Sequence, residues 1–302
     1  SSPLENIKAL QWVALPFAEG QPKERARHLE LRQSAESRAL RHAFFAERQA
    51  AKPDAIKGVT PRDIARIAVV GGGLMGAGIA AAALSAGYEV VIVERGKAEA
   101  EAAEVRVTGL LEGALKRGKI SREDFEKQWD NFSVAPDYGA AAGADLAIEA
   151  VFEDLEVKRE VFRNLAKAMG DDAILATNTS YLDPTEIFAG LPNPARCLGL
   201  HFFSPAHIMK LLEIVVMPET GPEVLATGFA FGRKLKKMTV LSGICDGFVG
   251  NRMLAAYRRE AEYLLADGAL PISAGWASAR ARAGIATPRA AEAPSATRRS
   301  RA

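Results

Sequence analysis

A glycine-rich turn between a short apolar run and a small-residue helix constrains this chain more than any other feature of its sequence. The turn reads Gly71-Gly72-Gly73-Leu74-Met75-Gly76 and fits the pattern G-x-G-x-x-G. It follows the β-branched run at 67–70, and Glu94 ends the next strand-like run. In that context the pattern predicts a strand–turn–helix–strand unit that binds a dinucleotide.

Each glycine of the turn has its own expected task. Gly71 permits the tight turn, Gly73 lets backbone amides approach a pyrophosphate at the helix N-terminus, and Gly76 lets the helix pack close on the strand. Glu94 would accept hydrogen bonds from the adenosine ribose and repel a 2′-phosphate, which favours NAD over NADP. Arg95 could instead hold that phosphate, so the sequence also contains an argument for NADP.

Strand-like and helical stretches continue to alternate after the turn. Short apolar runs occur at 90–93, 146–150, 174–177 and 211–216, and helical patterns occur at 97–119 and 157–169. This rhythm predicts an α/β fold of the Rossmann-like, doubly wound type, with a mainly parallel sheet and helices on both faces. We assign the predicted domain to residues 61–246.

The two flanks of this domain differ from it in composition. Residues 1–60 include a charged helical stretch, 38–48, with one narrow apolar seam, and are predicted to form a helical connector. Residues 247–271 are expected to begin a further helical domain. Residues 272–302 are rich in Ala and Arg with almost no large apolar side chains, so we expect a disordered tail there.

Global properties exclude several classes of function. The net charge of +2 gives no reason to expect a nucleic-acid partner. No apolar run reaches the roughly 18 residues of a membrane span, and none is expected. The two cysteines, Cys197 and Cys245, are too few for a disulfide framework, which is typical of a reducing compartment, so a cytoplasmic protein is expected.

A histidine and a carboxylate supply a candidate general base. His201 ends the strand-like run at 197–200, the place where open α/β sheets hold their ligands. Glu213 lies inside an apolar run, where a carboxylate is costly unless it is paired. His201 is its natural partner, and a histidine oriented by a carboxylate can accept a proton near neutral pH. By itself, however, His201 could equally be a satisfied core residue.

Ser180 and Asn251 are candidates for binding the oxygen of a substrate. Ser180 follows the run at 174–177, and Asn251 starts the last well-defined helical stretch. Ser180 alone could be a turn former and Asn251 alone a helix N-cap. A dinucleotide turn combined with a paired histidine suits oxidation of a secondary alcohol. The chain has no G-x-S-x-G nucleophile turn and no H-E-x-x-H spacing, so no metal site is expected.

Five separated motifs resemble the 3-hydroxyacyl-CoA dehydrogenase family. The resemblance runs from Arg66 to Pro271, and the motifs agree with the family in content and order. The five motifs are the glycine turn at 71–76, Ile148-Glu149-Ala150-Val151-Phe152-Glu153-Asp154, Thr177-Asn178-Thr179-Ser180, His201-Phe202-Phe203-Ser204-Pro205 and Gly247-Phe248-Val249-Gly250-Asn251-Arg252. The stretch at 38–48 resembles the connector helix of multifunctional fatty-acid oxidation enzymes. In those enzymes a hydratase/isomerase module precedes the dehydrogenase.

The resemblance implies a role for each candidate residue. It implies that His201 is the general base, that Glu213 orients it and stabilises its protonated form, and that Ser180 and Asn251 hold the substrate's 3-oxygen. Glu94 would bind the adenosine ribose. Further cofactor contacts would come from Met75, Val151, Phe152, Glu153, Lys158, Ser180 and Ser204, the last at a position where the family often has Asn. Lys116 and Lys119 could meet phosphates of CoA or could be plain solvated charges.

The resemblance also implies a substrate and partners. The implied reaction is NAD-dependent oxidation of (S)-3-hydroxyacyl-CoA to 3-oxoacyl-CoA in fatty-acid β-oxidation, and the alternative is a catalytically weak or silent NAD-binding fragment. Family members continue with a helical domain that closes over the acyl chain and forms a homodimer, and a thiolase-type partner is expected for the intact enzyme. Here the pattern ends at about Pro271, and out-of-frame reading of a GC-rich message is one hypothesis for the tail.

Overall fold

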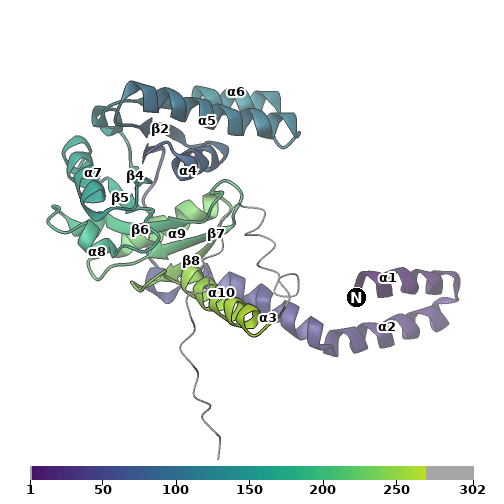
Figure 1. The fold of residues 1–302 in the computed structure, drawn as a ribbon. Coiled ribbons are helices and arrows are strands. Elements are labelled where there is room, and N and C mark those ends of the chain that lie inside the picture. Colours follow the sequence, from purple (N-terminus) through teal and green to yellow (C-terminus); the bar gives the residue numbers. More distant parts are fainter. Residues whose placement is uncertain (1, 270–302) are drawn as a thin grey trace, which may run out of the picture. The chain divides into compact units, whose positions relative to one another are not determined.

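The computed structural model describes residues 2–269, and its contacts divide the chain into a unit that ends at Cys245 and one that begins at Asp246. The first unit is built on one eight-stranded sheet (Figure 1). The strands are β1 (Arg66–Val70), β2 (Glu89–Val93), β3 (Phe132–Ala135), β4 (Leu146–Glu149), β5 (Ile174–Thr177), β6 (Cys197–Phe202), β7 (Leu211–Val215) and β8 (Met238–Ser242).

The strand order is β3-β2-β1-β4-β5-β6-β7-β8. The first six strands in sequence pair in parallel, β7 is antiparallel to β6, and β8 is parallel to β7. This confirms the predicted mainly parallel, doubly wound sheet. The order reverses at β1, so the crevice at the carboxyl ends of β1 and β4 is where such a sheet binds a ligand.

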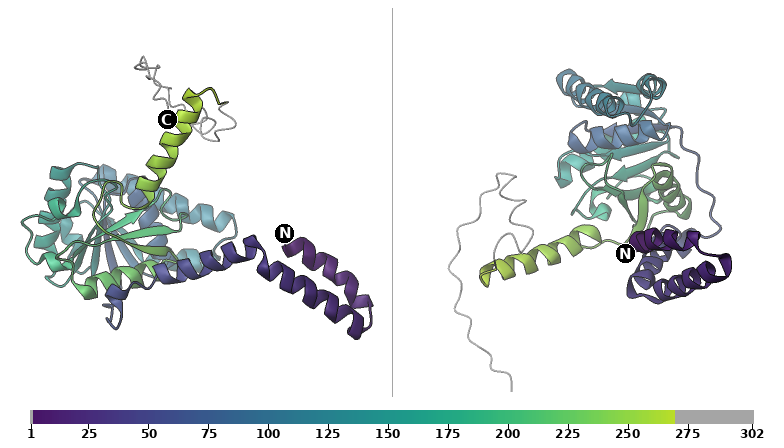
Figure 2. Two further views of the ribbon diagram at one scale, coloured as in Figure 1. Left: turned by 90° about the horizontal axis from the view of Figure 1, so that it is seen from below. Right: turned by 90° about the vertical axis from the view of Figure 1, so that its right-hand side faces the viewer.

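Helices cover both faces of the sheet (Figure 2). One face packs against α4 (Leu74–Ser85), α5 (Lys97–Lys116) and α9 (Pro222–Lys234), and the other against α7 (Leu155–Ala168) and α8 (Pro184–Ile187). The remaining short helices are α6 (Arg122–Asp130), η2 (Asp54–Ile56), η3 (Tyr138–Ala141) and η4 (Pro194–Arg196).

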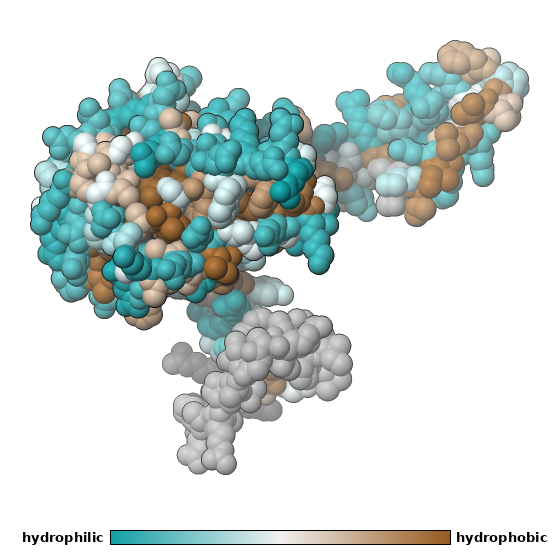
Figure 3. All heavy atoms as spheres, turned by 90° about the horizontal axis from the view of Figure 1, so that it is seen from above, coloured by the Kyte–Doolittle hydropathy of each residue, from teal (hydrophilic) through white to brown (hydrophobic). Residues whose placement is uncertain are grey.

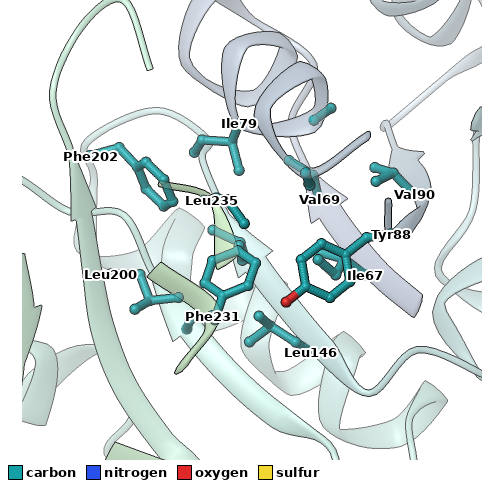
Figure 4. Packing of buried hydrophobic residues seen from close by; sticks show 14 of the residues in the cluster. Ile67, Val69, Ile79, Tyr88, Val90, Leu146, Leu200, Phe202, Phe231 and Leu235 are labelled. Atoms are coloured by element: carbon teal, nitrogen blue, oxygen red, sulfur yellow. The ribbon is translucent and has the colours of Figure 1, made fainter. Parts of the chain in front are cut away.

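The larger core contains apolar side chains from the central strands and from the helices that cover them (Figure 4). Ile67 and Val69 of β1 lie in this core together with Ile79 of α4, and the rings of Tyr88 and Phe231 lie 5.6 Å apart between centroids. Because successive strand residues face opposite sides, the β-branched runs of the central strands fill the cores on both faces. The sheet is therefore a rigid base for the loops at its edge.

Two strands were not predicted. The strand β3 has only four residues, none of them fully buried, and β8 lies at the opposite edge of the sheet with only Thr239 and Ser242 buried. The half-buried β3 lacks the continuous apolar run that marks a central parallel strand, whereas β8 reads MTVLS and its run at 238–241 could have been identified.

The segment predicted as a connector forms α1 (Ser2–Ala9), η1 (Leu10–Ala14), α2 (Phe17–Gln33) and α3 (Ala35–Ala50). The break between α2 and α3 comes at Ser34, whose hydroxyl caps α3 by accepting from the N–H of Ser37. Apolar side chains of these helices, such as Phe17, Leu40 and Phe45, are exposed. Figure 3 shows brown, hydrophobic residues at the surface of the molecule among the teal ones.

The second unit contains one described helix, α10 (Gly250–Ala266). It follows Gly247 and Phe248, which both have positive φ angles. The predicted disordered tail at 272–302 lies outside the described residues. Between residues 2 and 269, no helix combines the length and the apolar character needed to cross a membrane.

Candidate active site

The turn between β1 and α4 has the geometry that its glycines predicted. Gly71 has a φ of 92°, and a Cβ placed on it would lie 2.9 Å from the carbonyl oxygen of Ala150. A Cβ on Gly76 would overlap with the carbonyl oxygen of Gly71. Both positions therefore exclude larger residues, one by backbone conformation and the other by the close approach of helix to turn.

The start of α4 is open in the way a bound pyrophosphate requires. Gly73 is the N-cap of the helix and gives no side-chain hydrogen bond to it, so the N–H groups of the first turn are left for another acceptor. A Cβ on Gly73 would meet nothing within 4 Å. These residues fit a dinucleotide whose phosphates lie over the helix N-terminus.

Glu94 and its neighbours are already engaged around this turn. The Oε1 of Glu94 accepts a hydrogen bond of 2.6 Å from the N–H of Gly72, and the guanidinium of Arg95 pairs with Glu99 at 2.8 Å. Arg95, the residue that argued for NADP, makes this contact through its Nε atom in a solvent-exposed pair. Sequence reasoning missed Arg106, which reaches the carbonyl oxygen of Gly72 from α5 at 3.2 Å.

His201 and Glu213 are brought together by the one antiparallel pairing of the sheet. They are opposite partners in the β6–β7 register, so their side chains lie on the same face. The Nδ1 of His201 lies 2.7 Å from the Oε2 of Glu213, and both side chains are buried. The carboxylate contacts the ring at Nδ1, and the proton transfer is proposed for the other ring nitrogen, Nε2.

Ser180 is held by Glu153. It lies in the turn after β5, and the Oε1 of Glu153 accepts hydrogen bonds from the Thr179 hydroxyl (2.6 Å) and from the N–H groups of Ser180 (2.8 Å) and Tyr181 (3.1 Å). The other oxygen of Glu153 lies 3.2 Å from the Nζ of Lys158. Glu153 thus joins the turn after β4 to the turn that carries Ser180.

Glu149, the last residue of β4, is a buried carboxylate that sequence reasoning did not assign to the site. It pairs with the buried ammonium of Lys158 at 2.7 Å. The signal that identified Glu213, an acidic residue inside an apolar strand, is equally present in Leu146–Glu149 and could have identified Glu149.

The other predicted residues are placed as follows. Phe152 and Ser204 are exposed, and Met75 and Val151 are half-buried. Asn251 belongs to the first turn of α10 in the second unit, and the N-cap of that helix is Val249, so Asn251 is not the cap. Lys116 and Lys119 are exposed at the C-terminal end of α5. The contacts predicted for all of these residues stay predictions.

Comparison with models of protein families shows which family this chain belongs to. Residues 66–245 match the family model described as 3-hydroxyacyl-CoA dehydrogenase, NAD binding domain. The chain belongs to the 3-hydroxyacyl-CoA dehydrogenase family. This confirms the resemblance carried by the five motifs, and the cofactor of this dehydrogenase domain is NAD.

The relatives of this dehydrogenase chain include multifunctional enzymes. It is 38% identical to the peroxisomal bifunctional enzyme of Cavia porcellus over 268 residues, 86% of this chain and 36% of that protein. It is 39% identical over 237 residues to the peroxisomal fatty acid beta-oxidation multifunctional protein MFP2 of Arabidopsis thaliana, 78% of this chain and 33% of that protein. The chain therefore spans about a third of the length of these relatives.

Solved structures of dehydrogenases share the fold. The 3-hydroxybutyryl-CoA dehydrogenase of Escherichia coli K12 is 36% identical with a TM-score of 0.66, over 68% of this chain and 44% of that one. The dehydrogenase part of multifunctional enzyme 1 from C. elegans is 31% identical with a TM-score of 0.60, over 73% and 51%. The names of several curated relatives place them in peroxisomes or glyoxysomes, and the cytoplasmic location stays a prediction for this chain.

The environment of Glu153 predicts a pH effect on stability. Burial raises the pKa of Glu153, but the Thr179 hydroxyl, the charge of Lys158 and two backbone N–H groups outweigh it, so the pKa lies below its ordinary value of 4.5. A carboxyl whose pKa is lowered by folding stabilises the native state above the unfolded value, and this contribution is lost as the pH falls through the folded value.

We therefore expect Glu153→Gln to lower the melting temperature most near neutral pH. The difference from the wild-type chain should shrink as the pH is lowered through 4.5 and below, because both chains are then neutral at this position. Thermal melts of the two chains over this pH range measure the difference. A difference that does not change with pH would contradict the stated role of the ionised carboxylate.

Proposed function

We propose that the chain catalyses NAD-dependent oxidation of (S)-3-hydroxyacyl-CoA to 3-oxoacyl-CoA in fatty-acid β-oxidation. The observation that carries the proposal is the buried pair of His201 and Glu213, 2.7 Å apart at the edge of the sheet that also holds the glycine turn. A paired histidine at this edge has the chemistry to remove a hydroxyl proton. The family relationship supports the choice of a 3-hydroxyacyl thioester as substrate.

His201 performs the proton transfer in this proposal. Its Nε2 takes the proton of the 3-hydroxyl group, while the electron pair of the O–H bond forms the new C=O bond at carbon 3. A bound NAD would supply the acceptor for the hydride that leaves carbon 3. The imidazole becomes an imidazolium during this step, and the carboxylate of Glu213 at Nδ1 stabilises that positive charge and fixes the ring orientation.

Ser180 is proposed to bind the 3-oxygen as it gains carbonyl character, and the role expected of Asn251 stays a prediction. A hydroxyl is a donor suited to a developing carbonyl or alkoxide oxygen. The position of Ser180 is set by the hydrogen bond of 2.8 Å from its N–H to Glu153. In the reverse direction the Ser180 hydroxyl would polarise the 3-keto group and His201 would return the proton.

The proposal is tested by acetoacetyl-CoA-dependent oxidation of NADH. We expect the chain to consume NADH with acetoacetyl-CoA and to show no comparable rate with free acetoacetate, because the CoA moiety supplies binding energy away from the reacting carbon. The change in absorbance of NADH measures the rate, and quenching of protein fluorescence measures NADH binding separately. A chain that binds NADH without turning over acetoacetyl-CoA is a silent NAD-binding fragment, and the proposed reaction would then be wrong for it.

A further inference from the structure

Glu149 receives hydrogen bonds from three different parts of the first unit. Its side chain is fully buried at the end of β4. One carboxylate oxygen accepts from the Nζ of Lys158 on α7 (2.7 Å) and from the N–H of Val151 in the following turn (2.8 Å). The other oxygen accepts from the hydroxyl of Thr177 at the end of β5 (2.7 Å). Glu149 thus connects two strand ends and a helix directly beneath the proposed site.

A second carboxylate extends this connection to the substrate side. The Nζ of Lys158 lies 2.7 Å from Glu149 and 3.2 Å from Glu153. Glu153 in turn binds the N–H of Ser180 and the hydroxyl of Thr179. An unbroken series of contacts therefore runs from Val151, in the turn predicted to contact the cofactor, to Ser180, predicted to contact the substrate oxygen.

Stability alone does not account for such an arrangement. An ion pair removed from water pays a desolvation penalty that its mutual attraction only partly offsets, and well-packed apolar residues are often at least as stable in its place. Ionic hydrogen bonds instead contribute geometric specificity, because each one defines the distance and angle between the groups that it joins. Here the groups joined are the two turns on either side of the proposed reaction.

We propose that Glu149 is a positioning residue for the reaction. It orients Lys158 and the turn after β4 and, through Lys158 and Glu153, the turn that carries Ser180. The cofactor and the substrate oxygen are thereby held at the separation that C–H cleavage requires. This inference rests on the proposed function. Displacement of reacting groups by about 1 Å can cost roughly 10²-fold in rate.

The test compares Glu149→Gln with the wild-type chain in three measurements. We expect weaker NADH binding by fluorescence, a fall in kcat of about 10²-fold, and a larger primary isotope effect on kcat with a 3-hydroxyacyl-CoA deuterated at carbon 3. The isotope effect should rise because a displaced geometry makes C–H cleavage rate-limiting. A residue with only a structural role would change the amount of folded protein but not the isotope effect.

The matched control is Asp145→Asn, at the opposite end of the same strand. Asp145 also uses its carboxylate to hold backbone groups, accepting from the N–H groups of Ala65 and Arg66 at 2.8 and 2.9 Å. The Asp145→Asn variant should have a lower melting temperature than the wild-type chain, with the same isotope effect and the same NADH affinity. If Glu149→Gln does not fold, Thr177→Val carries the test, because it removes the hydroxyl that binds the other oxygen of the same carboxylate and leaves Lys158 in place.

The outcomes separate this inference from the proposed function. Unchanged NADH affinity and kcat in a folded variant would overturn the positioning role, as would a lower kcat with an unchanged isotope effect. A wild-type chain that binds NADH but does not turn over would overturn the proposed reaction only. In that case NADH affinity decides the inference: weaker binding by the Glu149 variant than by the Asp145 variant supports it, and equal binding refutes it.

Discussion

Replacing His201 by glutamine is expected to abolish turnover of acetoacetyl-CoA while leaving NADH affinity almost unchanged. Glutamine is close to histidine in volume and keeps a hydrogen-bonding group near Glu213, but it cannot accept and return a proton near neutral pH. Loss of a general base commonly costs about 10²- to 10⁴-fold in rate. His201 on β6 contacts Glu213 on β7 at 2.7 Å, whereas the glycine turn follows β1, which is separated from β6 by two strands. The substitution should therefore not disturb the cofactor turn.

The control for this variant is His42→Gln. His42 is exposed on α3, outside the sheet, so its replacement should change neither turnover nor NADH binding. Steady-state rates and fluorescence titrations of the three chains measure both quantities. Turnover that persists in His201→Gln at the wild-type rate would show that another group removes the proton.

Gly76→Ala is expected to destroy NADH binding and to destabilise the first unit. Its Cβ would overlap with the carbonyl oxygen of Gly71, which is backbone and can move only if the turn itself moves. Over-packing of this kind typically costs about 1–3 kcal/mol, and more where the backbone must shift. Because the displaced turn is the one proposed to bind the pyrophosphate, affinity for NADH should fall together with the melting temperature.

Two glycine variants separate stability from binding. Gly109 lies exposed inside α5 with nothing within 4 Å of a Cβ, so Gly109→Ala should stabilise the helix by roughly 0.5–1 kcal/mol without affecting NADH. Gly73→Ala also has open space around its Cβ, but that space is where the pyrophosphate is proposed to lie. It should lower the melting temperature only slightly, because Ala is a poorer N-cap than Gly, and should lose NADH affinity. Wild-type NADH affinity in Gly73→Ala would contradict the placement of the phosphates.

Much of the central architecture could be predicted from local pattern. The β-branched runs of β1 and β2, the three glycines and Glu94 lie within one short segment, and their meaning depends on sterics inside that segment. The close approach of Gly76 to Gly71 involves only residues of this turn and its helix, although the space at Gly71 is also limited by Ala150 in the turn after β4. The central strands were equally visible, because parallel strands buried on both faces are apolar throughout.

Contacts across the sheet decide which residues come together in the candidate site. His201 and Glu213 were expected to pair because a carboxylate in an apolar run needs a partner, but only the antiparallel β6–β7 register placed them opposite each other. The contact of Arg106 with the carbonyl oxygen of Gly72 depends on how α5 lies against the turn, whereas Arg95 pairs with Glu99 only four residues further along the chain. The edge strand β3 has a weak apolar signal, but the run at 238–241 in β8 could have been identified.

The sequence by itself determined the α/β fold, the dinucleotide turn and the candidate base, because each rests on interactions between residues close in the chain or on the cost of burying a single charge. Only the tertiary structure decided that Glu149, Lys158 and Glu153 form one series of contacts from the cofactor turn to Ser180. These residues come from a strand end, a helix and two turns. The contact with Ser180 depends on the pairing of β4 with β5, since neighbouring parallel strands bring their carboxyl ends together regardless of separation in sequence.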